Sequence, residues 1–158
     1  MHTPKFKKYS NEEIKNCLFI ALDQLFRNDE FLLENEVHER SVAHKLAEYL
    51  QLSFPGYHVD CEYNRHGIST KKLPRECNGE NKENVFPDII IHHRGYDNNL
   101  FVIEIKPNKS PTVDECDKAK LIEFTKLEGE YKYQLGLFIG FDHLNEPQIV
   151  YYKDGKQE

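Results

Sequence analysis

The chain has 158 residues, of which 30% are charged and 39% hydrophobic, and its net charge is −6. This length is typical of one domain with a sizeable core, so we expect a single domain over residues 1–158. Because no apolar run is long enough to span a bilayer and no signal-peptide pattern is present, we expect a cytoplasmic protein without a membrane partner. The acidic balance argues against a domain that coats nucleic acid non-specifically, since phosphate contacts dominate such binding.

Two amphipathic helices are predicted before the first strand. The segment Ser10-Asn11-Glu12-Glu13 has the capping-box form S-x-x-E, and apolar residues follow at helical spacing until Asn28-Asp29. A second helix is expected from about Asn35 to Leu52. Both helices carry an apolar side that must be buried, which predicts that they pack on the core.

The second helix has one acidic residue on its apolar side. Glu39 lies four and seven residues before Ala43 and Leu46, so it faces the core near the helix N-terminus. A glutamate here can interact with the helix dipole, or pair with Arg40 or a lysine. It can also point into a site formed by neighbouring strands, and the sequence leaves both interpretations open.

Three strands and a long polar segment come next. Residues 58–64 alternate as a strand, and Arg65–Asn84 follows without periodicity. A loop of this length is often functional or mobile, and its basic first half can contact phosphates, although a solvated hairpin loop is the alternative. The strands Val85–His93 and Leu100–Pro107 have hydrophobic residues on both faces, which predicts that both faces are covered.

The C-terminal part is predicted to contain one helix and two strands. A capping-box pattern at Thr112-Val113-Asp114-Glu115 opens a helix that runs to about Leu127, and strands are expected at Gln134–Phe141 and Gln148–Tyr152. The strand–helix–strand part should form a right-handed parallel crossover. The polar tail from Lys153 is expected to fray, and the four widely spaced cysteines are expected to be reduced thiols.

Ionisable residues interrupt two of the most apolar runs. Asp88 lies in the first of the paired strands, and Glu104 and Lys106 share one face of the second. A buried carboxylate is costly unless it is paired or binds a cation. Two carboxylates on adjacent strands can hold Mg²⁺, and a nearby lysine can orient water or stabilise developing negative charge. With Glu39 as a further ligand, these groups suit metal-assisted hydrolysis of a phosphodiester.

The same residues carry a family resemblance. Pro87-Asp88, followed sixteen residues after the aspartate by Glu104-Ile105-Lys106, resembles the PD-(D/E)xK motif of the restriction-endonuclease-like nuclease superfamily. The resemblance implies an α/β sandwich with a central mixed β-sheet flanked by helices, with core order αβββαβ, preceded here by an extra N-terminal helix. It also implies Asp88 and Glu104 as catalytic metal ligands, Lys106 as the catalytic lysine and Glu39 as an accessory metal ligand. The implied cofactor is Mg²⁺, for which Mn²⁺ should substitute.

Three further residues are candidates for contact with substrate. Lys109 lies just beyond the motif, Lys120 lies one helical turn from Asp117, and Gln134 opens a strand. Each has a structural alternative: a loop lysine in solvent, a surface ion pair with Asp117, and the start of a strand.

Aromatic residues are weaker candidates. His92 shares the Asp88 face, and we expect it at a strand end that approaches solvent. Four tyrosines can stack on bases, although strand aromatics more often pack in the core; they are Tyr131, Tyr133, Tyr151 and Tyr152.

The sequence therefore favours a metal-dependent nuclease, with DNA as the expected substrate, acting as a homodimer or with a partner protein. The alternative is a catalytically inactive nuclease-fold protein that acts as an interaction subunit, as the net charge of −6 suggests. A glycosidase that uses the paired carboxylates is disfavoured, because Lys106 accompanies Glu104 and the chain has no tryptophan for sugar stacking.

Overall fold

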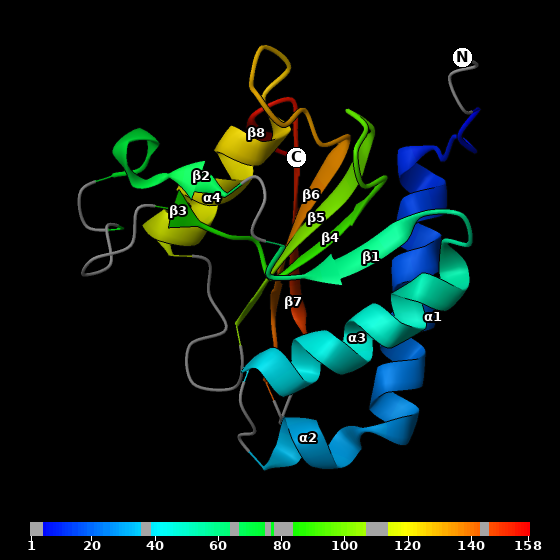
Figure 1. The fold of residues 1–158 in the computed structure, drawn as a ribbon. Coiled ribbons are helices and arrows are strands. Elements are labelled where there is room, and N and C mark those ends of the chain that lie inside the picture. Colours follow the sequence, from blue (N-terminus) through cyan, green and yellow to red (C-terminus); the bar gives the residue numbers. More distant parts are fainter. Residues whose placement is uncertain are drawn as a thin grey trace.

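The structure is a computed structural model, which describes residues 5–35, 39–63, 67–74, 77, 84–106, 114–142 and 146–158. It is a mixed α/β fold with a six-stranded, mostly antiparallel sheet flanked by helices (Figure 1). This confirms the predicted α/β class with a central sheet. None of the helices in these stretches is both long and apolar enough to cross a membrane.

Two long helices cover one face of the sheet. Helix α1 (Asn11–Asn28) begins at the predicted capping box, in which the Ser10 hydroxyl accepts from the Glu13 backbone N–H and the Glu13 carboxylate accepts from that of Ser10. Helix α3 (Glu39–Ser53) packs beside α1, and their apolar sides meet alternate residues of the sheet (Figure 1). A short helix between them, α2 (Glu30–Glu34), was not predicted.

The strand order in the sheet is β1-β4-β5-β6-β7-β8. These strands are β1 (His58–Cys61), β4 (Ile89–His92), β5 (Asn99–Lys106), β6 (Leu135–Gly140), β7 (Gln148–Lys153) and β8 (Lys156–Gln157). Strands β5 and β6 are parallel and are connected through helix α4 (Glu115–Thr125), so the predicted parallel crossover is confirmed. The other pairs in this sheet are antiparallel.

The second face of the sheet is covered by α4 and by a small hairpin. The hairpin pairs β2 (Ile68–Ser69) with β3 (Asn84–Val85), and one turn of 3₁₀ helix, η1 (Thr70–Lys72), follows β2. Ile90 and Val102 pack here against Phe124 of α4, whereas Ile89 and Ile103 pack on the opposite face. The central strands are therefore covered on both sides, as their sequence predicts, and the segment expected to lack structure contains these short elements.

Two local predictions are corrected by the structure. The N-cap of α4 is Asp114, whose side chain accepts from the backbone N–H of Asp117, whereas Thr112 lies outside the described residues. The C-terminal tail is paired with β7 through β8, because Asp154 and Gly155 both adopt positive φ, at 54° and 76°, and form a tight hairpin turn. An Asp-Gly pair between the apolar strand β7 and a polar tail was the missed signal.

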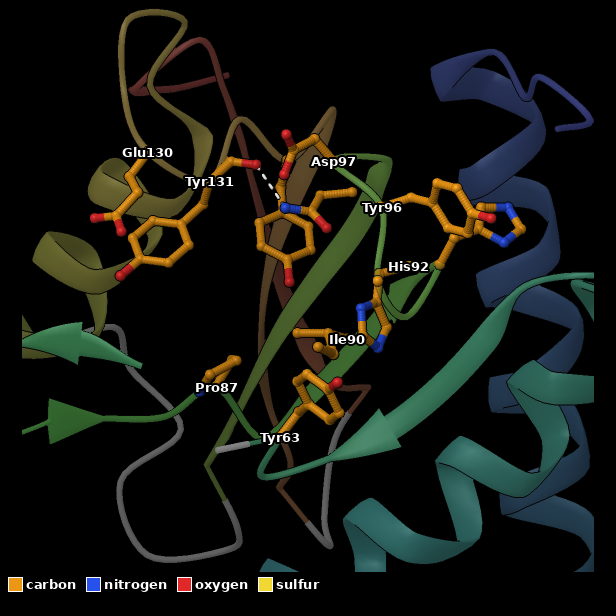
Figure 2. A pocket seen from close by; sticks show the side chains of 12 residues that line it. Tyr63, Pro87, Ile90, His92, Tyr96, Asp97, Glu130 and Tyr131 are labelled. Atoms are coloured by element: carbon orange, nitrogen blue, oxygen red, sulfur yellow. Dashed lines mark hydrogen bonds between the residues drawn. The ribbon is translucent and has the colours of Figure 1, made fainter. Parts of the chain in front are cut away.

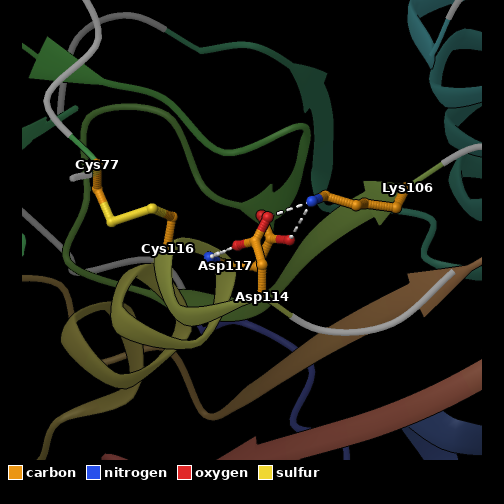
Figure 3. Close-up of a disulfide and its surroundings, with 5 residues drawn as sticks. All are labelled: Cys77, Lys106, Asp114, Cys116 and Asp117. Carbon is orange, nitrogen blue, oxygen red and sulfur yellow. Dashed lines mark hydrogen bonds and ion pairs between the residues drawn. A yellow bond between two sulfur atoms is a disulfide. The ribbon is translucent and has the colours of Figure 1, made fainter. Parts of the chain in front are cut away.

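The prediction of four reduced cysteines is also wrong. Cys77 and Cys116 form a disulfide with a Cα–Cα distance of 5.3 Å, which ties the segment after η1 to the first turn of α4 (Figure 3). Cys17 and Cys61 are free thiols. The two bonded cysteines are 39 residues apart, so their spacing in the sequence gave no indication of the bond.

Candidate active site

Three carboxyl groups from three different elements meet at one end of the central strands. Glu39 is the first residue of α3, Asp88 immediately precedes β4, and Glu104 lies in β5. Asp88 is fixed between the two strands because its Oδ2 accepts a hydrogen bond of 2.7 Å from the Ile105 backbone N–H. Asp88 also interacts with both other carboxyl groups, through a hydrogen bond to Glu39 and through the charge of Glu104. The structure thus brings together the three predicted metal ligands.

The three carboxyl groups have raised pKa values. Burial, followed by the charge of Glu104, raises the pKa of Asp88 to about 8. Burial, followed by the hydrogen bond to Asp88 and its charge, raises the pKa of Glu39 to about 8. Burial raises the pKa of Glu104 to about 7, although Lys120 opposes the shift. At neutral pH this cluster therefore retains protons, and its Glu39 carboxyl donates to Asp88.

Among the residues that the structure describes, Lys120 is the cation that contacts the cluster. Its Nζ donates a hydrogen bond of 2.7 Å to Oε2 of Glu104, and only 14% of its side chain is exposed. Burial by itself lowers the pKa of Lys120, but the charge and hydrogen bond of Glu104 outweigh burial, and the pKa is raised. Lys120 is therefore a charged, mostly buried residue and not the surface partner of Asp117 that its spacing suggested. The missed signal is its place on the buried side of α4, beside Leu121 and Phe124.

Lys106 contacts a different pair of acidic residues. Its Nζ donates to Asp114 and lies 3.5 Å from Oδ2 of Asp117, at the N-terminus of α4 (Figure 3). That Asp117 oxygen is buried and accepts no hydrogen bond from any described residue. Because 29% of the Lys106 side chain is exposed, it has more freedom than Lys120. The predicted catalytic lysine thus lies on the same strand as Glu104 but is directed to the helix.

A cavity of about 130 Å³ opens beside the carboxyl cluster. Glu39 and Asp88 form one part of its wall, and Cys61 and Glu62 form another. Glu62 has a positive φ of 45°, and its backbone N–H donates to the Asp88 carbonyl, which holds the chain around the opening. A small ligand can therefore reach Glu39 and Asp88 from this side.

The remaining candidates lie elsewhere or are not described. The Gln134 amide donates to the Tyr9 carbonyl at 2.8 Å and to Asn11 Oδ1 at 2.9 Å, which ties the start of β6 to the N-terminal segment. Gln134 therefore marks the start of a strand, and the partners of its side chain are Tyr9 and Asn11 and not the carboxyl cluster. Lys109 lies outside the described residues. His92 is buried and pairs with Asp60 at 2.7 Å, so the expectation of a solvent-facing histidine is wrong.

The carboxyl cluster fits a hard divalent cation in its donor chemistry. All three groups supply oxygen, which Mg²⁺ prefers, and Oε1 of Glu104 is buried without a hydrogen-bond partner among the described residues. The three carboxyl groups keep protons because their negative charges are close together and poorly solvated, and a bound cation would compensate the same charges. In the arrangement as it stands, however, the described Asp, Glu, His and Cys side chains form no group of three spaced to hold an ion. Binding by all three carboxylates would therefore need side-chain rotation.

The fold and the site define an α/β domain in which two buried carboxyl groups, Asp88 and Glu104, lie together with the partly buried Glu39 and Lys120. None of the protein-family models, curated proteins and solved structures compared with this chain matches it. The interpretation of the site therefore depends on its own residues.

Proposed function

We propose that the chain is a metal-dependent nuclease that hydrolyses phosphodiester bonds, with DNA as the expected substrate. The observation that carries the proposal is the convergence of Glu39, Asp88 and Glu104 from one helix and two strand segments. Two buried carboxyl groups, Asp88 and Glu104, with the partly buried Glu39 beside them, are costly in a small domain, and a structural role would be served equally by apolar side chains. A cation-binding role explains why these groups lie together beside an opening.

The order of the elements supports a restriction-endonuclease-like core within this proposal. Helix α3 is followed by β1, β4 and β5, then by α4 and β6, which corresponds to αβββαβ once the small hairpin is set aside. Asp88 and Glu104 lie on neighbouring strand segments, as the PD-(D/E)xK resemblance implies. Helix α1 is the extra N-terminal helix.

Asp88, Glu104 and Glu39 would hold the Mg²⁺ ion. The ion would supply positive charge to polarise a phosphoryl oxygen and to favour ionisation of water. Lys106 is free enough to leave Asp114 and to approach a phosphate, where its charge would stabilise the negative charge that develops during hydrolysis. Lys120 would hold the Glu104 carboxylate in place and keep it ionised.

Cleavage assays with four variants test this proposal. Supercoiled plasmid and single- and double-stranded oligonucleotides are incubated with Mg²⁺ or Mn²⁺, with EDTA as the metal-free control. We expect Asp88→Asn and Lys106→Ala to lower the cleavage rate by at least about 100-fold, the scale of a lost catalytic group. Glu48→Gln and Lys45→Ala are matched controls, because this exposed ion pair lies in α3 away from the cluster.

Equal cleavage by wild-type protein and Asp88→Asn would overturn the nuclease proposal, since a contaminating activity would then explain it. Absence of cleavage of every substrate with either metal would also overturn it. Loss of activity in the two control variants would show that the assay reports folding and not the site.

The second candidate is an interaction subunit that keeps the nuclease fold without activity. The observation that favours it is the Lys120–Glu104 pair, because a lysine already neutralises one of the three carboxylates. In that case calorimetry would detect no Mg²⁺ binding, and the chain would be recovered from cells with a stable protein partner.

A further inference from the structure

A larger cavity, of about 320 Å³, lies along β4 on the face of the sheet that carries α4 (Figure 2). Four tyrosines and two histidines contribute to its lining. Figure 2 shows Tyr131 on one side, His92 and Tyr96 on the other, and Ile90 and Tyr63 below. Six of the twelve lining residues are therefore aromatic, and such rings are the surface that a flat ring prefers.

The aromatic walls are held in place by the protein itself. The ring of Tyr131 contacts Phe124 edge-on at 5.1 Å, and its hydroxyl donates to the Gly67 carbonyl at 2.9 Å. On the other side, the ring of Tyr63 contacts His92 edge-on at 4.7 Å, and His92 is in turn fixed by Asp60. A ligand would meet rings that are already ordered, which lowers the entropy cost of binding.

The polar groups in the lining suit the edge of a heterocycle. Asp97 and Asn99 add a carboxylate and an amide beside the rings. Carboxylate and amide oxygens accept hydrogen bonds from the exocyclic amines of adenine, cytosine and guanine. The Asn99 amide nitrogen donates to the Tyr131 carbonyl at 2.7 Å, which orients the Asn99 side chain and leaves its oxygen as the acceptor (Figure 2).

Two acidic residues near the cavity have basic partners. Glu130 forms an ion pair with Lys72 at 3.1 Å, and Asp60 is paired with Arg94. The charges of Glu130 and Asp60 are thus neutralised by their basic partners, which reduces the repulsion of a phosphate backbone near the cavity.

The position of the cavity relates it to the carboxyl cluster. Pro87, in its lining, immediately precedes Asp88, and Ile90 shares the strand face of Asp88 at a distance of about 7 Å along the strand. A nucleotide bound in the cavity would therefore have a neighbouring phosphodiester within reach of Asp88. A base that is stacked and paired in a duplex cannot enter such a pocket, whereas an unpaired base can.

We propose that this cavity binds an unpaired base of a single-stranded nucleic acid, whose backbone continues toward Asp88. The proposal rests on the proposed nuclease function for the position of the backbone, but binding of the base needs neither metal nor cleavage. It assigns a binding role to four tyrosines that lie between the strands and helices, namely Tyr63, Tyr96, Tyr131 and Tyr133. It also implies that single strands, or duplexes with unpaired segments, are the preferred substrates.

Fluorescence anisotropy with the full chain tests base binding without cleavage. The protein carries Asp88→Asn and is kept in EDTA, and the probes are labelled single strands of equal length with bases or with abasic sugar units. We expect the strand with bases to bind roughly 5- to 100-fold more tightly than the abasic strand, as stacking of one base contributes on this scale. Because the two probes carry the same charge, their difference reports the bases alone.

A pair of tyrosine variants localises the binding. Tyr63→Leu removes a ring from the cavity, whereas Tyr151→Leu removes a similarly half-buried ring that packs in the core on the opposite side of the sheet. We expect Tyr63→Leu to abolish most of the preference for bases and Tyr151→Leu to leave it unchanged. The abasic comparison needs no substitution in the cavity, so it remains decisive even if Tyr63→Leu fails to fold.

Equal affinity for the two probes would overturn the cavity proposal, as would tighter binding of a duplex than of the single strand. Binding of tetramethylammonium but not of adenosine, measured by calorimetry, would identify the cavity as a cation site and would overturn it as well. Metal-dependent cleavage without a preference for bases would leave the nuclease proposal standing and remove only the cavity proposal. A preference for bases without cleavage under any condition would support the cavity proposal and overturn the nuclease proposal.

Discussion

Lys120 and Glu104 form a mostly buried hydrogen-bonded ion pair, with a distance of 2.7 Å between Nζ and Oε2. The two residues belong to α4 and β5, so the pair connects the helix to the strand that carries the candidate site. Glu104 is only 2% exposed, and its second oxygen has no hydrogen-bond partner among the described residues. The lysine is therefore the main compensation for the buried charge.

Removal of Lys120 should destabilise the protein strongly. We expect Lys120→Met to lower the free energy of unfolding at pH 8 by about 3–5 kcal/mol, because Glu104 is then left as an unpaired buried charge. The double variant Lys120→Met/Glu104→Gln should recover a large part of that loss. Urea unfolding measures both, and Lys45→Met is the control, since its exposed pair with Glu48 should contribute less than about 1 kcal/mol. Equal losses in the single and double variants would contradict a direct pair.

Stability without metal should fall as the pH rises from about 6.5 to 8. The folded pKa values of Glu39, Asp88 and Glu104 are raised to about 8, 8 and 7, so the folded state binds more protons than the unfolded state in this range. Each proton of difference lowers the free energy of unfolding by about 1.4 kcal/mol per pH unit.

Two histidines set the lower limit of the pH range in which stability should fall as the pH rises. Burial lowers the pKa values of His92 and His93, so below about pH 6.5 they make stability rise with pH and oppose the carboxyl groups. Urea unfolding in EDTA at several pH values measures the dependence, and Asp88→Asn should flatten it above pH 6.5. Stability that rises with pH over this range in the wild-type protein would contradict the raised pKa values.

Divalent cations should stabilise the protein, and more at pH 8 than at pH 6. A cation competes with the protons that the carboxyl cluster retains, so its binding is favoured when those protons are lost. At a concentration 100 times the dissociation constant we expect about 2.7 kcal/mol of added stability, measured as a shift in Tm. Asp88→Asn and Glu104→Gln should abolish the shift, whereas Glu48→Gln should keep it. A Mg²⁺ or Mn²⁺ shift that survives both site variants would place the cation elsewhere.

Loss of the Cys77–Cys116 bond should lower stability. The bond closes a loop with a sequence separation of 39 residues, and disulfides typically contribute about 2–4 kcal/mol. Cys77→Ser/Cys116→Ser should therefore unfold at lower urea concentration than the wild type, and a reductant should have the same effect on the wild type only. Cys17→Ser is the control, because Cys17 is a free thiol. A reductant that changes the double variant equally would mean that the bond is not its target.

Local patterns predicted the elements well where side chains signal the backbone directly. The capping box at Ser10 and the apolar run Ile89 to Ile91 depend on neighbours in sequence, and α1 begins at that capping box. The strand predicted over Val85–His93 is shorter in the structure, because β4 covers only Ile89–His92 and Val85 belongs to β3 of the small hairpin. Glu39 was placed on the core side of its helix by spacing alone. By contrast, α2 and β8 are too short for a periodic pattern, so they were missed.

The sequence by itself determined that carboxylates would be buried, because Asp88 and Glu104 stand in runs of apolar residues that can only form central strands. Only the tertiary structure decided which cation accompanies them. Lys120 is 16 residues from Glu104 in the chain, and the crossover through α4 places it there, while Lys106 turns to Asp114. The disulfide and the aromatic cavity have the same origin, since both join segments that no local pattern relates. Backbone hydrogen bonds and side-chain periodicity act over a few residues, whereas ion pairs, disulfides and cavities arise where distant segments pack.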